Sequence, residues 1–283
     1  MKHALAAAFA ALALSACASS APAPRPDVAL YALDCGRLTT TNADIFADDG
    51  AYAGVTRDMV DPCYLIRHPA GDLIWDTGLP EALAQAPGGV IENGPFRLSM
   101  PTTLSAQLTQ LGLTPADIEF VSFSHSHFDH SGNGGLFAAS TWIVDADERA
   151  YMFRPEARAD AQSFAAYAAL ENANTRLIAG DADHDVFGDG SVTIIQAPGH
   201  TPGHAVLLVR LADAGPILLT GDMFHLAESR ANRRVPRFNV DRAQTLASMD
   251  KIERIAAETG ARVVRQHVPE DFDALPRFPE ALR

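Results

Sequence analysis

The chain has 283 residues, of which 47% are hydrophobic and 20% are charged. This balance is typical of an ordinary folded protein and excludes a disordered chain or a collagen-like one. The 35 acidic side chains outnumber the 22 basic ones and give a formal net charge of −13. Such a charge repels a phosphate backbone and argues against nucleic acid as a partner.

The first residues are typical of an export signal. Residues 1–3 are a short basic start, and the apolar run Ala4–Leu14 is shorter than the roughly 20 residues that a membrane-spanning helix needs. The Leu-Ser-Ala-Cys sequence at 14–17 resembles the lipobox of bacterial lipoproteins, in which the cysteine, here Cys17, is lipidated and begins the mature chain. A plain signal peptide cut near Ala16 or Ala18 is the alternative.

Both interpretations predict export. The lipoprotein interpretation assigns residues 1–16 to the signal peptide and places the protein at the periplasmic face of a membrane, expected to be the outer membrane, held only through a lipidated Cys17. Residues 17–26 are rich in Pro, Ala and Ser, cannot bury apolar surface, and predict an extended tether. Residues 27–283 show no low-complexity break and predict a single folded domain.

Apolar runs rich in Val and Ile predict strands along this domain, and helical periodicity falls between them. The predicted strands are Val28–Leu33, Cys63–Arg67, Leu73–Trp75, Phe120–Phe123, Thr141–Val144, Val192–Gln196, Ala205–Leu211, Ile217–Leu219 and Val263–Val264. The predicted helices are Leu104–Leu111, Asp160–Asn172 and Leu246–Ile255. The mixture indicates an α/β or α+β sandwich, with helices outside a two-sheet core.

Four of the predicted strands lead directly into a side chain that can bind a metal. These side chains are His125, His200, Asp222 and His267. Ligands gather at strand ends in α/β architectures, because the sheet holds the loops there rigidly while the loops themselves can vary. The four strand ends could therefore converge on one site.

The densest signal is His125-Ser126-His127-Phe128-Asp129-His130. In an extended segment His125 and His127 point to the same side, so both imidazoles can bind one ion, while a following turn can direct Asp129 and His130 to a second. A mixed imidazole and carboxylate set fits zinc better than calcium or magnesium, and manganese, iron or cobalt remain alternatives. We therefore expect two Zn²⁺ ions.

These residues resemble the His-x-His-x-Asp-His motif of the metallo-β-lactamase superfamily. The resemblance implies a four-layer αββα sandwich with two metal sites. It assigns His125, His127 and His200 to the first metal and Asp129, His130 and His267 to the second, with Asp222 bridging both.

Three flanking segments resemble the N-acyl homoserine lactonase branch, the quorum-quenching lactonases. They are Leu30–Arg37, Pro62–Pro69 and Leu73–Pro80, and the resemblance runs from about Val28 to His267. β-Lactamases that share the motif generally lack the bridging aspartate, so Asp222 argues against them. Glyoxalase II carries a helical domain after its last histidine, whereas only 16 residues follow His267 here.

The resemblance implies a zinc-dependent hydrolase that opens the lactone ring of N-acyl homoserine lactones through a hydroxide bridging two metals. Asp129 would then carry a proton to the leaving oxygen. In lactonases of this type a tyrosine three positions after the bridging aspartate bonds the substrate carbonyl, and here that position is His225. A histidine can donate the same bond, so Asp129 and His225 are the expected catalytic residues, with a loop histidine as the alternative for His225.

Several other residues leave two interpretations open. Asp76 supports a ligand histidine in this superfamily, although a plain strand-end turn is the alternative. His204 is expected to be structural or to support a ligand, and His68 and His184 are expected to be solvated. Cys35 and Cys63 lie on apolar strands, where free buried thiols are the default and export permits a disulfide.

The substrate pocket is the least determined part. The stretch Ala86–Pro101 carries Gly and Pro and is the best candidate for a lid or substrate loop. Phe96, Met100, Phe153 and Phe164 could line a pocket for the acyl chain or belong to the core. A related hydrolase of aryl or sulfate esters, or a metal-binding lipoprotein without turnover, remains an alternative.

Overall fold

The computed structural model of the protein describes residues 26–283. The expected signal peptide, Cys17 and nearly all of the expected tether lie outside the described residues. Among the residues described, no helix is long and apolar enough to span a bilayer.

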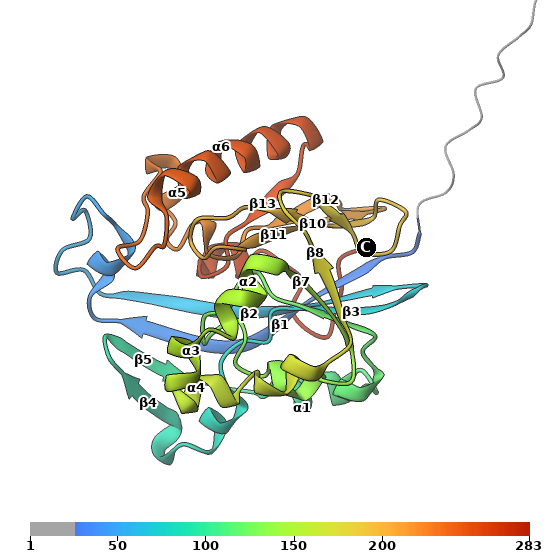
Figure 1. Ribbon diagram of the computed structural model, residues 1–283, viewed down its shortest axis with the longest axis horizontal. Coiled ribbons are helices and arrows are strands. Elements are labelled where there is room, and N and C mark those ends of the chain that lie inside the picture. The colour runs from blue at the N-terminus through green and yellow to red at the C-terminus, as the bar shows by residue number, and fades with distance from the viewer. Residues whose placement is uncertain (1–25) are drawn as a thin grey trace, which may run out of the picture.

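Two sheets form the centre of the molecule (Figure 1). The larger has eight strands in the order β4-β5-β1-β2-β3-β6-β7-β8. Its strands are β1 (Ala29–Thr40), β2 (Arg57–His68), β3 (Gly71–Trp75), β4 (Val90–Asn93), β5 (Phe96–Ser99), β6 (Phe120–Ser122), β7 (Thr141–Asp145) and β8 (Thr175–Ile178). β1, β2 and β3 pair antiparallel, whereas β3, β6, β7 and β8 are parallel.

The smaller sheet has five strands in the order β13-β12-β11-β10-β9. Its strands are β9 (His184–Asp185), β10 (Val192–Gln196), β11 (Ala205–Leu211), β12 (Gly215–Leu219) and β13 (Arg262–Val264). The helices are α1 (Leu104–Gln110), α2 (Ala146–Met152), α3 (Pro155–Ala159), α4 (Ala161–Ala165), α5 (Ser229–Asn232), α6 (Arg242–Thr259) and α7 (Pro269–Asp273).

Three apolar clusters define the layers. Side chains of both sheets, such as Ile66 and Leu207, share one buried cluster between the sheets. A second cluster joins the outer face of the larger sheet to Leu104 of α1 and Met152 of α2. A third joins the outer face of the smaller sheet to α6, including Met249, and Figure 1 shows α6 lying over that sheet. The expected αββα sandwich is confirmed.

Helix α6 shows how the sequence sets an element and its packing. The Asp241 side chain accepts a hydrogen bond from the Gln244 N–H and so caps the first turn, and Gly260 ends the helix with a φ of 66°. The buried positions recur three or four residues apart, which places one face of the helix on the sheet. They are Thr245, Ser248, Met249, Ile252 and Ala256.

Two predicted segments differ from the structure. The continuous helix expected over Asp160–Asn172 is wrong, because it is divided into α4 and a 3₁₀ helix at Ala168–Asn172. The stretch Ala86–Pro101, expected as a lid or substrate loop, is not a free lid, because it forms the hairpin of β4 and β5, and β5 pairs with β1 at the edge of the larger sheet. Thr40 pairs with Phe96 there, so backbone hydrogen bonds fix this stretch to the sheet.

The side-chain state of two cysteines and one histidine also differs from expectation. Cys35 and Cys63 are fully buried and form a disulfide rather than free thiols. His68 was expected to be solvated, yet its ring stacks on Phe187 at 4.0 Å and its Nε2 lies 2.9 Å from the Asp189 carboxylate. Its side chain is only 5% exposed. His184 is half-buried on the edge strand β9.

Candidate metal centre

The motif histidines and the other expected ligands meet at one edge of the sandwich. His125 to His130 follow β6 of the larger sheet, whereas His200, Asp222 and His267 follow β10, β12 and β13 of the smaller sheet. The strands end at the same edge, so loops from both sheets contribute side chains. All seven expected ligands come together in two adjoining groups.

The first group contains His125, His127, His200 and Asp222. The Nδ1 atom of His127 lies 2.8 Å from Nε2 of His125 and 3.1 Å from Nε2 of His200. The Oδ2 atom of Asp222 lies 3.5 Å and 3.4 Å from those same two Nε2 atoms. Ligands of a tetrahedral zinc ion stand roughly 3.3 Å apart, given metal–ligand distances near 2.0–2.1 Å.

The second group contains Asp129, His130 and His267. The Nε2 atom of His267 lies 3.8 Å from Oδ2 of Asp129 and 2.9 Å from Oδ1 of Asp222. The Nε2 atom of His130 lies 3.9 Å from Oδ1 of Asp129 and 3.2 Å from Oδ1 of Asp222. Asp222 therefore directs one carboxylate oxygen to each group, which is the arrangement that a bridging ligand requires.

Several atoms in this cluster are buried and lack a hydrogen-bond partner. They are Nε2 of His130, Nδ1 of His200, Oδ1 of Asp222 and, next to the two groups, Nε2 of His225. Buried polar atoms normally have partners, because leaving one unpaired costs about 1–3 kcal/mol. Imidazole nitrogens and carboxylate oxygens that converge in a buried place are the donor set of a transition-metal ion. The cluster thus fits two metal cofactors.

Burial and the short distances between these side chains shift the pKa values of several of them. Burial lowers the pKa of His125 and His127 well below the usual range, and neighbouring histidines add to the effect. Burial alone would also lower the pKa of His267, but the carboxylates of Asp222 and Asp129 raise it to about 9. Neutral His125 and His127 present lone pairs, as metal ligands must.

The carboxylate of Asp76 contacts His130 of the second group. Asp76 is fully buried and adopts a φ of 57°, a left-handed conformation that is rare for a residue with a side chain. Its Oδ2 lies 3.1 Å from Nδ1 of His130 and accepts a bond from the Ser124 hydroxyl at 3.0 Å, while its Oδ1 accepts from the Ser124 N–H at 2.6 Å. Of the two interpretations left open, this contact with His130, one of the expected ligands, favours a supporting role over a plain turn.

His204 contacts the bridging residue without joining the ligand groups. Its Nε2 accepts a hydrogen bond of 3.1 Å from the backbone N–H of Asp222, and its Nδ1 lies 3.1 Å from the Ala197 carbonyl. Burial lowers its pKa to about 3, so the ring is neutral and can accept that bond. The expectation that His204 has a structural or supporting place is confirmed.

Glu148 is a buried residue of the site that sequence reasoning missed. One carboxylate oxygen accepts a 2.7 Å bond from the N–H of Ser126, which lies between His125 and His127, and the other accepts a 3.0 Å bond from the N–H of Gly203. Glu148 lies at the start of α2 and is only 3% exposed. It therefore ties together the two loops that carry the histidines of the first group. In the sequence Glu148 lies between Asp147 and Arg149, a charged stretch that resembles any exposed one and does not indicate a role in the site.

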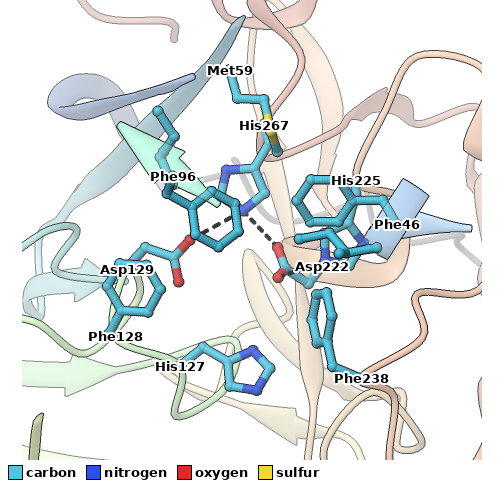
Figure 2. A pocket seen from close by; sticks show the side chains of 12 residues that line it. Phe46, Met59, Phe96, His127, Phe128, Asp129, Asp222, His225, Phe238 and His267 are labelled. Carbon is cyan, nitrogen blue, oxygen red and sulfur yellow. Dashed lines mark ion pairs between the residues drawn. The ribbon is translucent and has the colours of Figure 1, made fainter. Parts of the chain in front are cut away.

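A cavity of about 180 Å³ opens next to the carboxylates. Figure 2 shows the phenylalanine rings around Asp129, Asp222 and His267. The lining residues are Leu38, Ile45, Phe46, Met59, Phe96, His127, Phe128, Asp129, Asp222, His225, Phe238 and His267. A mostly apolar pocket with a few polar groups at one end is typical of a small-molecule site.

The aromatic candidates separate into two places. Phe96 lines the cavity, whereas Met100 packs in the apolar cluster beside it. Phe153 and Phe164 do not reach the cavity, because they pack with Trp142 in the cluster outside the larger sheet. Phe46 and Phe238 were missed, since nothing in the sequence directs the loops that carry them toward the site.

His225 lies at the wall of this cavity. Its Nε2 lies 3.0 Å from Oδ2 of Asp222, and its ring stacks on Phe46 with centroids 4.8 Å apart. The side chain is buried, with 2% exposure. The structure thus places the expected catalytic histidine where it can face a molecule bound in the cavity.

Comparison with known proteins agrees with this geometry. The model of the metallo-beta-lactamase superfamily matches residues 58–267. The chain is 34% identical over 261 residues to the N-acyl homoserine lactonase AttM of Azorhizobium caulinodans, covering 90% of this chain and 97% of that one. It is 26% identical to the N-acyl homoserine lactonase AiiA of Bacillus thuringiensis subsp. kurstaki, covering 89% and 98% of the two chains.

Solved structures give the same result. An N-acyl homoserine lactone hydrolase with the product N-hexanoyl-L-homoserine at its catalytic metal center superposes with a TM-score of 0.75 and 26% identity, covering 90% of this chain and 98% of that one. The dizinc quorum-quenching lactonase AidC has the same fold, with a TM-score of 0.64, 18% identity and coverage of 91% of each chain. The chain belongs to the metallo-beta-lactamase superfamily, in its N-acyl homoserine lactonase branch.

Proposed function

We propose that this protein hydrolyses the lactone ring of N-acyl homoserine lactones. The observation that carries the proposal is the double ligand cluster, with Asp222 between its halves, at the end of an apolar cavity. The relatives with 26–34% identity over nine-tenths of this chain are named for that activity. Zinc is the metal we propose, because the donor set is imidazole and carboxylate.

The residues divide the work between binding the metals and handling the substrate. Two bound cations would supply a nucleophile from water at neutral pH and polarise the lactone carbonyl. Asp129 belongs to the second group and also lines the cavity, with 11% of its side chain exposed. Its carboxylate can therefore take a proton from the attacking water and deliver it to the ring oxygen as the ring opens.

His225 is proposed to bind the substrate carbonyl. Its ring lines the cavity next to Asp222 and can donate one hydrogen bond, as a phenol would. The variant His225→Phe should lose turnover while it keeps the stacking on Phe46, and His225→Tyr should restore much of it. If His225→Phe is as active as the native protein, His225 does not bind the substrate carbonyl.

The test of function is a substrate panel with the purified zinc-loaded protein. The panel holds acyl homoserine lactones, a simple lactone, an aryl ester, a sulfate ester, a thioester and a β-lactam, and acid release is followed for each. We expect preference for the acylated lactones. Asp222→Ala and His127→Ala should lose bound metal and turnover together. If an ester is cleaved while the acyl homoserine lactones stay intact, the proposed substrate is wrong, although the assignment to the superfamily still holds.

We also propose that the protein is exported and held by a lipidated Cys17. The lipobox-like sequence and the apolar run before it support this proposal. The Cys35–Cys63 disulfide supports it independently, since such bonds persist in oxidising compartments. Cys17→Ser should move the protein from the membrane fraction to the soluble periplasmic one, and an unchanged distribution would contradict the lipid anchor.

A further inference from the structure

Two segments far apart in the chain cover the metal cavity. Phe46 ends the 3₁₀ helix at Ala43–Phe46, and Phe238 lies in the connection between α5 and α6. Their ring centroids are 5.9 Å apart. The ring of Phe238 also lies 5.8 Å from His127 and 5.6 Å from His225, although Phe238 is 42% exposed. The two phenylalanines thus form the mouth of the cavity.

Three ion pairs join these two segments. We call their six residues the mouth ion-pair cluster: Asp44 with Arg237, Asp49 with Arg234, and Asp48 with Arg242. The Arg237–Asp44 bond is 2.5 Å long and the Arg234–Asp49 bond is 3.2 Å long. Each pair links residues at least 185 positions apart. Figure 1 shows the loop after β1 next to α5 and the connection that follows it.

Arg237 makes the closest connection, because its backbone takes part as well. Its N–H donates a 2.8 Å bond to the Ile45 carbonyl, and its Nε donates a 3.1 Å bond to the Ala47 carbonyl. These two carbonyls lie on either side of Phe46. Arg237 therefore fixes the backbone that carries Phe46, and its own neighbour in the chain is Phe238.

Apolar contact supports the two segments unequally, because Phe46 is 3% exposed and packs in a buried cluster with Leu38 and Met59, whereas Phe238 is 42% exposed. Asp48, Asp49, Phe238 and Val240 are all exposed, and exposed segments open more readily than core elements. The polar bonds between the segments therefore tie the exposed segment of Phe238 to the buried Phe46. A protein with 22 basic residues places three arginines within nine positions here, directly opposite three aspartates.

We propose that the mouth ion-pair cluster determines substrate affinity and specificity by positioning Phe46 and Phe238 over the cavity. The inference rests on the proposed function for the identity of the substrate. Phe46 and Phe238 would contact the apolar acyl part of the substrate, while the reacting lactone lies at the metals. The six charged residues are positioning residues, since they act through the rings and do not touch the metals.

The experiment compares Arg237→Gln, Asp44→Asn and the double variant with Arg254→Gln. Arg254 is a matched control, because it pairs with Glu258 on the exposed side of α6. For hexanoyl homoserine lactone we expect KM to rise about 5- to 10-fold in each single variant with kcat within about twofold, which corresponds to a loss near 1 kcal/mol. For γ-butyrolactone, which has no acyl chain, neither constant should change.

Two further measurements separate positioning from general damage. The double variant should resemble Arg237→Gln, because that substitution already breaks the ion pair as well as the Nε bond to the Ala47 carbonyl. High salt should raise KM in the native protein and have little effect in the double variant, since the screening length falls to about 3 Å at 1 M. Additive effects of the two substitutions, or a KM that matches the Arg254→Gln control, would overturn the proposal.

Hydrogen exchange keeps this test separate from the test of function. Arg237→Gln should speed exchange in residues 43–50 as well as in residues 233–242, with the rest of the chain unchanged. Faster exchange confined to the substituted segment would show that the cluster does not couple the two, and would overturn the proposal even if lactones are hydrolysed. If the native protein hydrolyses no lactone, the proposed function fails and exchange still decides whether the cluster holds the mouth.

Discussion

Removal of the Glu148 carboxylate should weaken the first ligand group although Glu148 itself lies outside it. Its two oxygens accept bonds from the N–H groups of Ser126 and Gly203 at 2.7 and 3.0 Å. In Glu148→Ala both donors lose their partner in a buried place. At about 1–3 kcal/mol for each unsatisfied group, the free energy of unfolding should fall by roughly 2–6 kcal/mol.

Part of this loss should appear as weaker metal binding. Ser126 lies between His125 and His127, and Gly203 lies three residues after His200, so relaxation of either loop displaces a ligand. Loss of a group that orients metal ligands typically lowers metal affinity by about 10- to 100-fold. Glu148→Gln should show an intermediate effect, because its amide oxygen can accept one bond while its NH₂ group faces the other donor.

The assay is metal content per chain after dialysis against graded chelator, together with urea unfolding of the metal-free protein. Asp185→Ala is the control, because the Asp185 carboxylate also accepts two backbone N–H groups, those of Gly188 and Gly190, in a loop away from the site. It should lose stability without loss of metal affinity. If Glu148→Ala binds metal as tightly as Asp185→Ala, the hydrogen bonds of Glu148 to Ser126 and Gly203 do not position the histidines of the first group.

Three other predictions concern the support around the site. Asp76→Ala removes one of the two partners of His130 Nδ1, the other being the Ser124 hydroxyl, and should weaken metal binding in the second group by about 10- to 100-fold, measured by metal titration; unchanged affinity would contradict the support assigned to Asp76. Replacement of both Cys35 and Cys63 by Ala opens a loop of 28 residues and should lower the free energy of unfolding by about 3.5 kcal/mol; reductant should then have no further effect on the variant. Gly203→Ala places a methyl group 2.3 Å from Asp145 Oδ1 and 2.6 Å from the backbone nitrogen of Glu148, so the melting temperature and the metal content should both fall. Gly180→Ala is the control, because its methyl group meets no atom although the φ of 62° is strained for alanine. It should lower the stability and leave the metal content unchanged.

The ligands could be predicted from the sequence because the reason for their convergence is local. A buried parallel strand is a continuous apolar run, and the residue at its end must lie at the edge of the sheet. His125 follows the parallel strand β6, His200 follows β10, which pairs antiparallel, and Asp222 and His267 follow the parallel pair β12 and β13. The expected sandwich followed from the same alternation of strands and helices. The helix expected at Asp160–Asn172 failed because its residues are mostly exposed or half-buried, and no tertiary surface favours one straight helix there.

The supporting groups could not be predicted, because their partners are distant in the chain and have no repeating pattern. Glu148 bonds to Ser126 and Gly203, 22 and 55 residues away, and a lone glutamate on a short helix resembles any solvated one. The disulfide likewise depends on the pairing of β1 with β2, which brings Cys35 next to Cys63 only after the sheet has formed.

The mouth of the cavity illustrates a further limit. Phe46 and Phe238 lie in irregular segments, so neither strand alternation nor helical periodicity assigns their direction. What orients them is a set of charges on residues 44–49 and 234–242, each of which reads in the sequence as ordinary surface polarity. Substitution of these charges leaves every metal ligand in place and changes only the apolar wall. Relatives with the same seven ligands can therefore differ in the acyl groups they accept, and the difference should follow the two segments rather than the metal motif.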